Sequence, residues 1–190
     1  MLEVLKQYLD KFHVQADQDY ELIMRVAEVR NYNRKVIVVH EGETEQYFNF
    51  IARGLARKYF LKGKEEIITQ IAREGEMISS SVSFFTGDPS TYFVETIEPT
   101  VFVSFTRDTL EDLYQTDRKW QRLGRLIITE LLLQKEYWEL DRIQLNTHDR
   151  VRKFLTTNSD LLQRVPQKYF ASYLNIKPET FSRLKHLLKN

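Results

Sequence analysis

Five of the six glycines in this 190-residue chain lie between residues 42 and 87, and their spacing strongly constrains the fold. Successive glycines are separated by 12, 9, 12 and 12 residues. Glycine supplies the positive φ that tight turns need. Short runs rich in β-forming residues lie between and around these turns, at 35–40, 47–52, 56–60, 66–71, 81–85, 92–97 and 100–105. The pattern predicts an antiparallel barrel, roll or sandwich.

Helices are expected on both sides of this β-rich region. Residues 2–12 and 17–29 precede it, and residues 107–114 follow it with an acidic first turn. Residues 117–144 contain no proline and one glycine, and their apolar side chains recur at helical spacing. The clearest stripe of this long helix is formed by Trp120, Leu123, Ile127, Leu131 and Trp138. The stripe favours a helix that pairs with a second copy along a two-fold axis, and a single central helix buried in one monomer is the alternative.

The last 45 residues read as short helices, at 148–157, 160–164, 167–174 and 179–188. Pro166 and Pro178 stand where helices begin, since the first helical position needs no N–H. Asn175 tolerates the left-handed conformation of a tight link. Two short helices joined in this way have the spacing of a helix-turn-helix.

Charge divides the chain unevenly. Residues 146–190 hold nine Lys or Arg against three acids, a formal charge of +6, whereas residues 1–145 carry −5. A cationic end on an anionic body indicates a polyanionic partner at that end, although a solvated helical surface has the same composition.

The outward face of the last helix carries side chains that suit duplex DNA. Arg183 can bind guanine O6 and N7 as a fork, Glu179 can accept from cytosine N4, and Ser182 can do either. Phosphate contacts are expected from Gln167, Lys168, Thr180, Lys185 and Lys189. A helical protein-interaction bundle with a polar face is the alternative.

Residues 165–185, and Glu179-Thr-Phe-Ser-Arg183 within them, resemble the DNA-binding signature of the Crp/Fnr family of bacterial regulators. Val36-Ile-Val-Val-His-Glu-Gly42 and Tyr47-Phe-Asn-Phe-Ile-Ala-Arg-Gly54 resemble the entry to that family's cyclic-nucleotide-binding β-roll. In the family, the residues at the places of Glu179, Ser182 and Arg183 read bases. The resemblance implies a β-roll, then a long dimer helix, then a helix-turn-helix.

The phosphate-binding cassette departs from this family. Its cyclic-nucleotide binders have Gly-Glu-Leu followed by Arg-Ser, whereas an ungapped alignment from Gly75 puts Ser79-Ser80 and Ser90-Thr91 at those places. Serine lacks the charge-assisted clamp that arginine gives a phosphate. We therefore expect no cyclic AMP or cyclic GMP binding of the usual kind. A candidate pocket for another effector is lined by Ser79, Ser80, Ser81, Ser90 and Thr91, and a vestigial loop is the alternative.

These observations predict an α+β protein: an antiparallel β-roll of the double-stranded β-helix type with flanking helices, a long dimerisation helix and a helix-turn-helix. The expected boundaries are 1–115 for the sensor domain, 116–145 for the long helix and 146–190 for the DNA-binding domain. The expected partners are double-stranded DNA, a second copy and, as a further candidate, RNA polymerase. A ligand-sensing module that acts on protein partners is the competing function.

Other classes of function have little support. The chain has no cysteine, which excludes disulfides and thiolate metal sites. It has no nucleophile–base pair, P-loop or HExxH motif, so we expect no enzyme, no cofactor and no metal. No segment reads as a signal peptide or membrane span, and a cytoplasmic location is expected.

Overall fold

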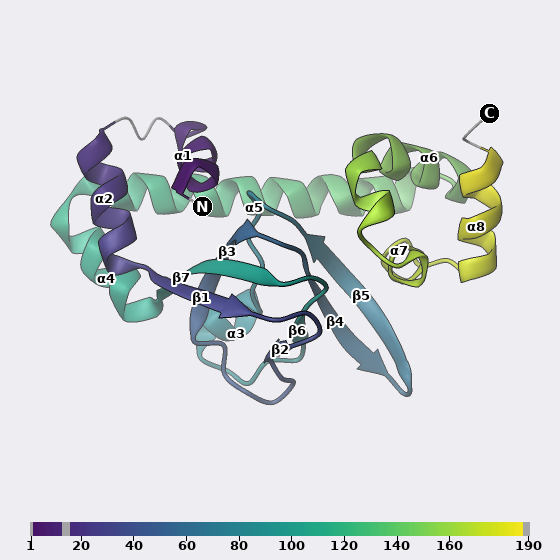
Figure 1. Ribbon diagram of the computed structural model, residues 1–190, viewed down its shortest axis with the longest axis horizontal. Helices are drawn as coiled ribbons and strands as arrows, with labels where there is room; N and C mark the ends of the chain where they lie inside the picture. Colours follow the sequence, from purple (N-terminus) through teal and green to yellow (C-terminus); the bar gives the residue numbers. More distant parts are fainter. Residues whose placement is uncertain (1, 13–15, 188–190) are drawn as a thin grey trace. The chain divides into compact units, whose positions relative to one another are not determined.

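The computed structural model describes residues 2–12 and 16–187 (Figure 1). By its internal contacts the chain divides into two compact units. Unit 1 comprises residues 1–61 and 69–127, and unit 2 comprises residues 62–68 and 128–190.

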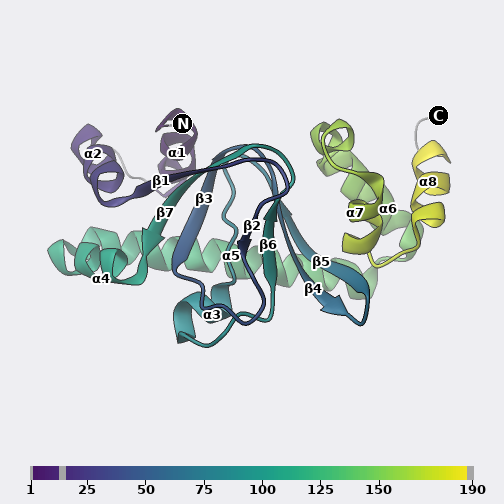
Figure 2. The ribbon, with the colours of Figure 1, turned by 60° about the horizontal axis from the view of Figure 1, so that its bottom comes forward.

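Unit 1 contains two sheets, whose strands are labelled in Figure 2. The first has the strand order β1-β7-β3, formed by Glu28–Tyr32, Thr100–Thr106 and Tyr47–Arg53. The second has the order β2-β6-β4-β5, formed by Ile37–Val39, Phe93–Thr96, Ala56–Lys62 and Glu65–Ala72. β7 pairs antiparallel with both β1 and β3, and β6 pairs antiparallel with both β2 and β4. The expected antiparallel β-rich domain is confirmed.

Apolar side chains from both sheets meet in one core. Ile51 on β3 and Phe102 on β7 come from the first sheet, while Ala56 and Val94 come from the second. These four residues are fully buried. Because successive side chains of a strand point to opposite faces, each sheet contributes one face to this core. The runs of β-forming residues read from the sequence overlap six of these seven strands, all except β1.

Gly54 shows why the turns require glycine. Its φ is +98°, and a Cβ placed there would lie 2.4 Å from the carbonyl oxygen of Pro99. Any other residue would be strained in φ and would collide with that backbone oxygen. The Gly54 amide also donates to the Glu74 carboxylate at 2.8 Å.

One predicted strand is a helix. Residues 81–85 were expected as a strand, but Ser81–Thr86 form the short helix α3. Gly87 ends it in the left-handed conformation, with its amide donating to the Ser83 carbonyl. The prediction relied on β-forming residues, but packing outweighs local propensity here. Ser83 and Phe84 are buried side by side, whereas Val82 and Phe85 are exposed, and a strand would not alternate in this way.

The second correction concerns the entry to the sheet. Residues 17–29 were expected as one helix, but α2 (Asp17–Val26) ends earlier and β1 begins at Glu28. β1 pairs with β7 from Glu28 to Tyr32. This pairing is between residues far apart in sequence, so local periodicity gave no sign of it.

The remaining helices of unit 1 agree with expectation. They are α1 (Leu2–Asp10), α4 (Arg107–Thr116) and the first part of α5 (Arg118–Gln144). α5 is one continuous helix of 27 residues. Gly124 lets α4 approach it closely, since a Cβ at Gly124 would lie 2.3 Å from the Tyr114 hydroxyl oxygen.

Unit 2 contains the second part of α5 and four short helices. These are α6 (Thr147–Thr157), the 3₁₀ helix η1 (Ser159–Gln163), α7 (Gln167–Tyr173) and α8 (Pro178–Leu187). Aromatic rings form the centre of their core. The Phe170 ring lies 5.3 Å from that of Phe154 and 5.7 Å from that of Phe181. All three side chains are buried.

The link between α7 and α8 is a tight turn of defined geometry. Asn175 has a φ of +55°, as expected for this position. Its amide donates to the Ser172 carbonyl, and the Ile176 amide donates to the Ala171 carbonyl at 2.9 Å. These two bonds make a Schellman motif, which ends a helix and reverses the chain. α7, this turn and α8 form a helix-turn-helix.

Within unit 2, α7 also contacts residues 62–68. The Ser172 hydroxyl donates to the Glu66 carbonyl at 2.7 Å and accepts from the Ile68 amide at 3.0 Å. β5 is an edge strand, so these backbone groups would otherwise lack a partner in the sheet.

Candidate nucleic-acid interface

α8 presents one polar face and one buried face. Phe181 and Leu184 are buried against the helical core. Glu179 and Arg183, four residues apart and therefore on one side of the helix, are exposed, and Ser182 beside them is half-buried. The side chains of these three residues form no hydrogen bond or ion pair with any other described residue. They are available to an external partner.

The residues expected at phosphates are distributed over both helices. Gln167 and Lys168 are exposed in the first turn of α7, while Thr180 and Lys185 on α8 are half-buried. Lys189 lies outside the described residues. The positive charge expected at this end of the chain therefore reaches solvent at Lys168, and also at Lys177 in the turn.

The serines of the cassette have a different environment. Ser79, Ser80 and Ser90 are each at most 3% exposed. The Ser79 hydroxyl accepts from the Asn49 amide at 2.9 Å, and the Ser90 hydroxyl donates to that of Ser80 at 2.7 Å. The Ser90 hydroxyl also accepts from the Tyr92 amide at 3.0 Å.

The other two members of the proposed pocket are less enclosed: Ser81 is half-exposed and Thr91 is exposed. The five residues therefore differ in burial, and three of them are hydrogen-bonded within the chain.

A buried carboxylate near these serines was missed. Glu45 reads from the sequence as a solvated turn residue, but it is 3% exposed. Its carboxylate accepts from the amides of Tyr47 at 3.1 Å and Ser80 at 3.2 Å. Burial raises the pKa of Glu45, an effect that these two amide donors oppose. Its neighbours Thr44 and Gln46 are polar, so no hydrophobic pattern indicated burial.

Buried cations on β4 were missed as well. The Arg57 guanidinium forms an ion pair with the Glu95 carboxylate at 2.6 Å, with side chains 3% and 12% exposed. The neighbouring Lys58 ammonium donates to the Ser79 carbonyl at 3.0 Å. Each cation thus already has an acceptor within the protein. The run of β-forming residues at 56–60 gave no sign that Arg57 and Lys58 are buried.

The stripe predicted for dimer contacts on α5 needs correction. Trp120 and Leu123 are 2% and 8% exposed in the single chain, so unit 1 already covers them. Ile127 and Leu131 are half-buried, and the Trp138 ring stacks on that of Tyr173 at 4.5 Å within unit 2. The apolar periodicity was real, but it marks mainly the face that packs within the chain.

α5 has a second apolar face that is open to solvent. Its exposed residues are Ile128, Leu132, Leu133, Tyr137, Leu140 and Ile143. Ile128, Leu132 and Leu140 fall at intervals of four or eight residues, which places them on one side of the helix. An apolar stripe of this kind on a long helix is typical of an interaction surface.

None of the described helices is both long enough and apolar enough to cross a membrane, and α5 is too polar despite its length.

Residues 29–117 match the family of cyclic nucleotide-binding domains. No curated protein matches the sequence.

Solved structures resemble the chain over most of its length. FixK2 from Bradyrhizobium japonicum is 21% identical, with a TM-score of 0.74, and the match covers 86% of this chain and 85% of FixK2. CLP of Xanthomonas campestris, described as a c-di-GMP responsive global regulator, is 16% identical with a TM-score of 0.70 and 92% coverage of both chains. The Thermus thermophilus catabolite activator protein is 19% identical with a TM-score of 0.55, over 94% of this chain and 85% of that one.

Proposed function

We propose that this chain, which has the fold of the Crp/Fnr regulators and a cyclic nucleotide-binding domain at residues 29–117, is a DNA-binding transcription regulator. One observation carries the proposal: Glu179, Ser182 and Arg183 stand together on the solvent-facing side of the second helix of a helix-turn-helix, without partners among the described residues. The second helix of this motif is the one that enters the major groove.

The chemistry of the three side chains sets their roles. The planar guanidinium of Arg183 matches the two acceptors of guanine, and Glu179 accepts from the cytosine amino group. Ser182 donates or accepts at an adjacent base. Gln167, Lys168, Thr180, Lys185 and Lys189 hold the backbone phosphates, which fix the register of the helix but carry no sequence information.

The regulator acts as a homodimer on a palindromic operator. The exposed apolar stripe of Ile128, Leu132 and Leu140 on α5 meets the same stripe of a second copy across a two-fold axis. Two helix-turn-helices related by this axis read half-sites about 34 Å apart. RNA polymerase stays a predicted further partner.

Cyclic nucleotides do not switch this regulator in the usual manner. A cyclic phosphate needs a charge-assisted clamp, whereas Ser90 and Thr91 occupy the places of Arg-Ser and Ser80 occupies the place of the ribose-binding acid. Each lost hydrogen bond to a charged group removes about 1.5–3 kcal/mol. The buried serines are bonded to one another and to the backbone instead. Titration calorimetry with cyclic AMP and cyclic GMP is expected to show no binding in the low micromolar range.

DNA binding is tested by gel shift with genomic fragments upstream of the gene for this chain. Retention of a fragment at protein concentrations that leave random DNA free supports the proposal. Equal affinity for all fragments, or no retention, favours a sensing module that acts on protein partners.

The dimer is tested by light scattering on Leu132→Asp. A carboxylate placed against its symmetry mate has no partner in an apolar interface, so the variant should be monomeric. Glu136 lies four residues further along the same face, and Glu136→Leu should tighten association by extending the apolar stripe. A monomeric wild-type protein at micromolar concentration contradicts this assembly.

A further inference from the structure

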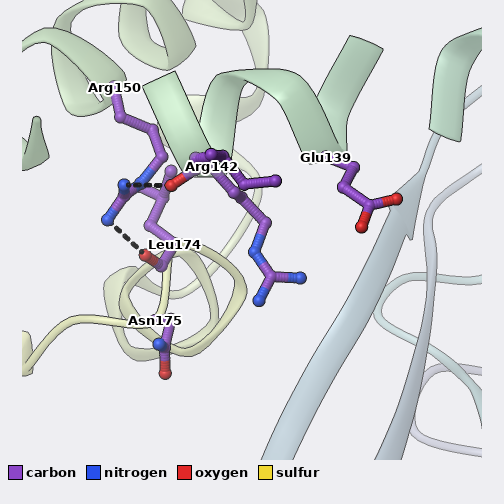
Figure 3. Close-up of a pocket in the computed structure, with 6 residues that line it drawn as sticks. Glu139, Arg142, Arg150, Leu174 and Asn175 are labelled. Atoms are coloured by element: carbon purple, nitrogen blue, oxygen red, sulfur yellow. Dashed lines mark hydrogen bonds between the residues drawn. The ribbon is translucent and has the colours of Figure 1, made fainter. Parts of the chain in front are cut away.

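Unit 2 contains a pocket of about 200 Å³ that the proposed DNA-binding role does not use (Figure 3). α5 and α6 contribute charged side chains and one apolar side chain, and the end of α7 and its turn contribute an apolar residue and an amide. The lining residues are Glu139, Arg142, Ile143, Arg150, Leu174 and Asn175. Drug-sized ligands occupy about 300–1,000 Å³, so this pocket suits a smaller molecule.

Two side chains of opposite charge, Glu139 and Arg142, line the pocket without pairing with each other. Glu139 and Arg142 extend from the same side of α5, and Figure 3 shows their charged groups apart. In the described part of the chain, neither side chain forms a hydrogen bond or an ion pair. The pocket therefore offers an uncommitted guanidinium and an uncommitted carboxylate.

Arg150 connects this pocket to the helix ends. Its guanidinium donates to the carbonyls of Leu145 at 3.2 Å and Leu174 at 3.4 Å, and more weakly to that of Arg142 at 3.5 Å. These carbonyls belong to the C-terminal ends of α5 and α7, which carry partial negative charge. The Arg150 Nε is buried and has no acceptor among the described residues. One donor in the lining thus lacks a partner.

We propose that this pocket binds a small amino acid. The carboxylate of the ligand takes the fork of Arg142, as planar guanidinium groups favour. Its ammonium group pairs with Glu139, and its side chain lies on Ile143 and Leu174. An inorganic phosphate or a simple carboxylate fits less well, because either brings negative charge near Glu139 without pairing it.

The position of the pocket connects ligand binding to the helix-turn-helix. Leu174 and Asn175 form the turn of the helix-turn-helix, and Asn175 holds its left-handed conformation. A ligand held between α5 and this turn stabilises one arrangement of the two elements over others. The amino acid is therefore an effector of the helix-turn-helix, bound away from the serine-lined cassette.

The test is titration calorimetry on the full chain without DNA, so its outcome is independent of whether the chain binds an operator. The probes are glycine, L-alanine and L-leucine, with propionate and ethylamine as analogues of alanine that lack one charged group. At least one amino acid should bind with a dissociation constant below about 10 mM, and L-alanine should bind at least tenfold more tightly than either analogue.

Matched variants test the contributions of Arg142 and Glu139 to binding one at a time. Arg142→Gln should weaken amino-acid binding at least tenfold, while Glu139→Gln should abolish the preference for alanine over propionate. Arg152→Gln on α6, which pairs with Asp149 and does not line the pocket, should bind as wild type. Thermal unfolding of each variant checks that it is folded. Absence of saturable heat with all three amino acids, or unchanged affinity in folded Arg142→Gln, overturns the proposal.

Discussion

The outward face of α8 and the serine-rich loop around α3 are both polar, yet their hydrogen bonds go to different places. Glu179, Ser182 and Arg183 on α8 have no partner among the described residues. Ser80 and Ser90 in the loop bond to each other. Polar composition alone therefore does not distinguish a surface prepared for a partner from a site that is already filled.

The difference has an energetic basis. A buried polar group without a partner destabilises a fold by about 1–3 kcal/mol, so buried hydroxyls are bonded internally. Exposed groups are bonded to water, and a ligand can replace that water at little loss. Mutations in a closed loop should change the free energy of unfolding, whereas mutations on an open face should change the affinity for a partner.

Glu95→Gln should give the largest effect, because Glu95 on β6 pairs with Arg57 on β4 in the buried interior of the β-domain. The substitution leaves the buried Arg57 guanidinium without its counter-charge, and breaking a buried ion pair in this way destabilises by about 3–5 kcal/mol. Denaturant unfolding measures the loss. The double variant Arg57→Met with Glu95→Leu removes both charges and should lose much less. If Glu95→Gln unfolds at the wild-type midpoint, the region around β4 is more solvated than its burial indicates.

Arg183→Ala should give the second-largest effect, a loss of DNA affinity at the outward face of α8. Loss of one bidentate base contact weakens binding by about 1–3 kcal/mol and relaxes discrimination at one base position. Stability should stay close to that of the wild type, because Arg183 is exposed. Fluorescence anisotropy on operator and random DNA measures both affinities, with Arg152→Ala as the control. Equal losses on the two DNAs would show that Arg183 does not read bases.

The sequence predicted the open face better than the closed one for a physical reason. Phe181 and Leu184 repeat at helical spacing, and this local periodicity assigned Glu179 and Arg183 to the opposite side. The burial of Glu45 depends on the amides of Tyr47 and Ser80, and the latter lies 35 residues away. β1 likewise depends on β7, about 70 residues further on. Contacts of this range leave no periodic signal in one sequence.

The long helix shows a third case. Periodicity located α5 almost to the residue, but it did not say which of two apolar faces is covered within the chain. Trp120 and Leu123 are covered, while Leu132 and Ile143 are exposed. Only packing separates the two faces, since both repeat at intervals that suit a helix.

Ser90→Ala should produce a smaller loss of stability. The Ser90 hydroxyl accepts from the Tyr92 amide and donates to the Ser80 hydroxyl, so its removal leaves a part-buried N–H without that acceptor. We expect a loss of about 1–2 kcal/mol by thermal unfolding. Thr91→Ala is the matched control, because its side chain is exposed and should change stability by less than about 0.5 kcal/mol. Equal effects of the two changes would show that the cassette is not closed by its own hydrogen bonds.

Lys168→Ala should give the smallest effect, and salt dependence is the measurement that resolves it. Lys168 is exposed in the first turn of α7, where a phosphate contact is expected. Each phosphate contact releases counterions and contributes about 0.9 to the slope of log K against log salt concentration. A dimer that carries the change twice should lose roughly double that slope. Affinity for operator and random DNA should fall by the same factor, unlike the sequence-dependent loss expected for Arg183→Ala. Lys135→Ala on α5 serves as the control for net charge. A loss confined to the operator would instead make Lys168 a base-reading residue and extend the open face from α8 onto α7.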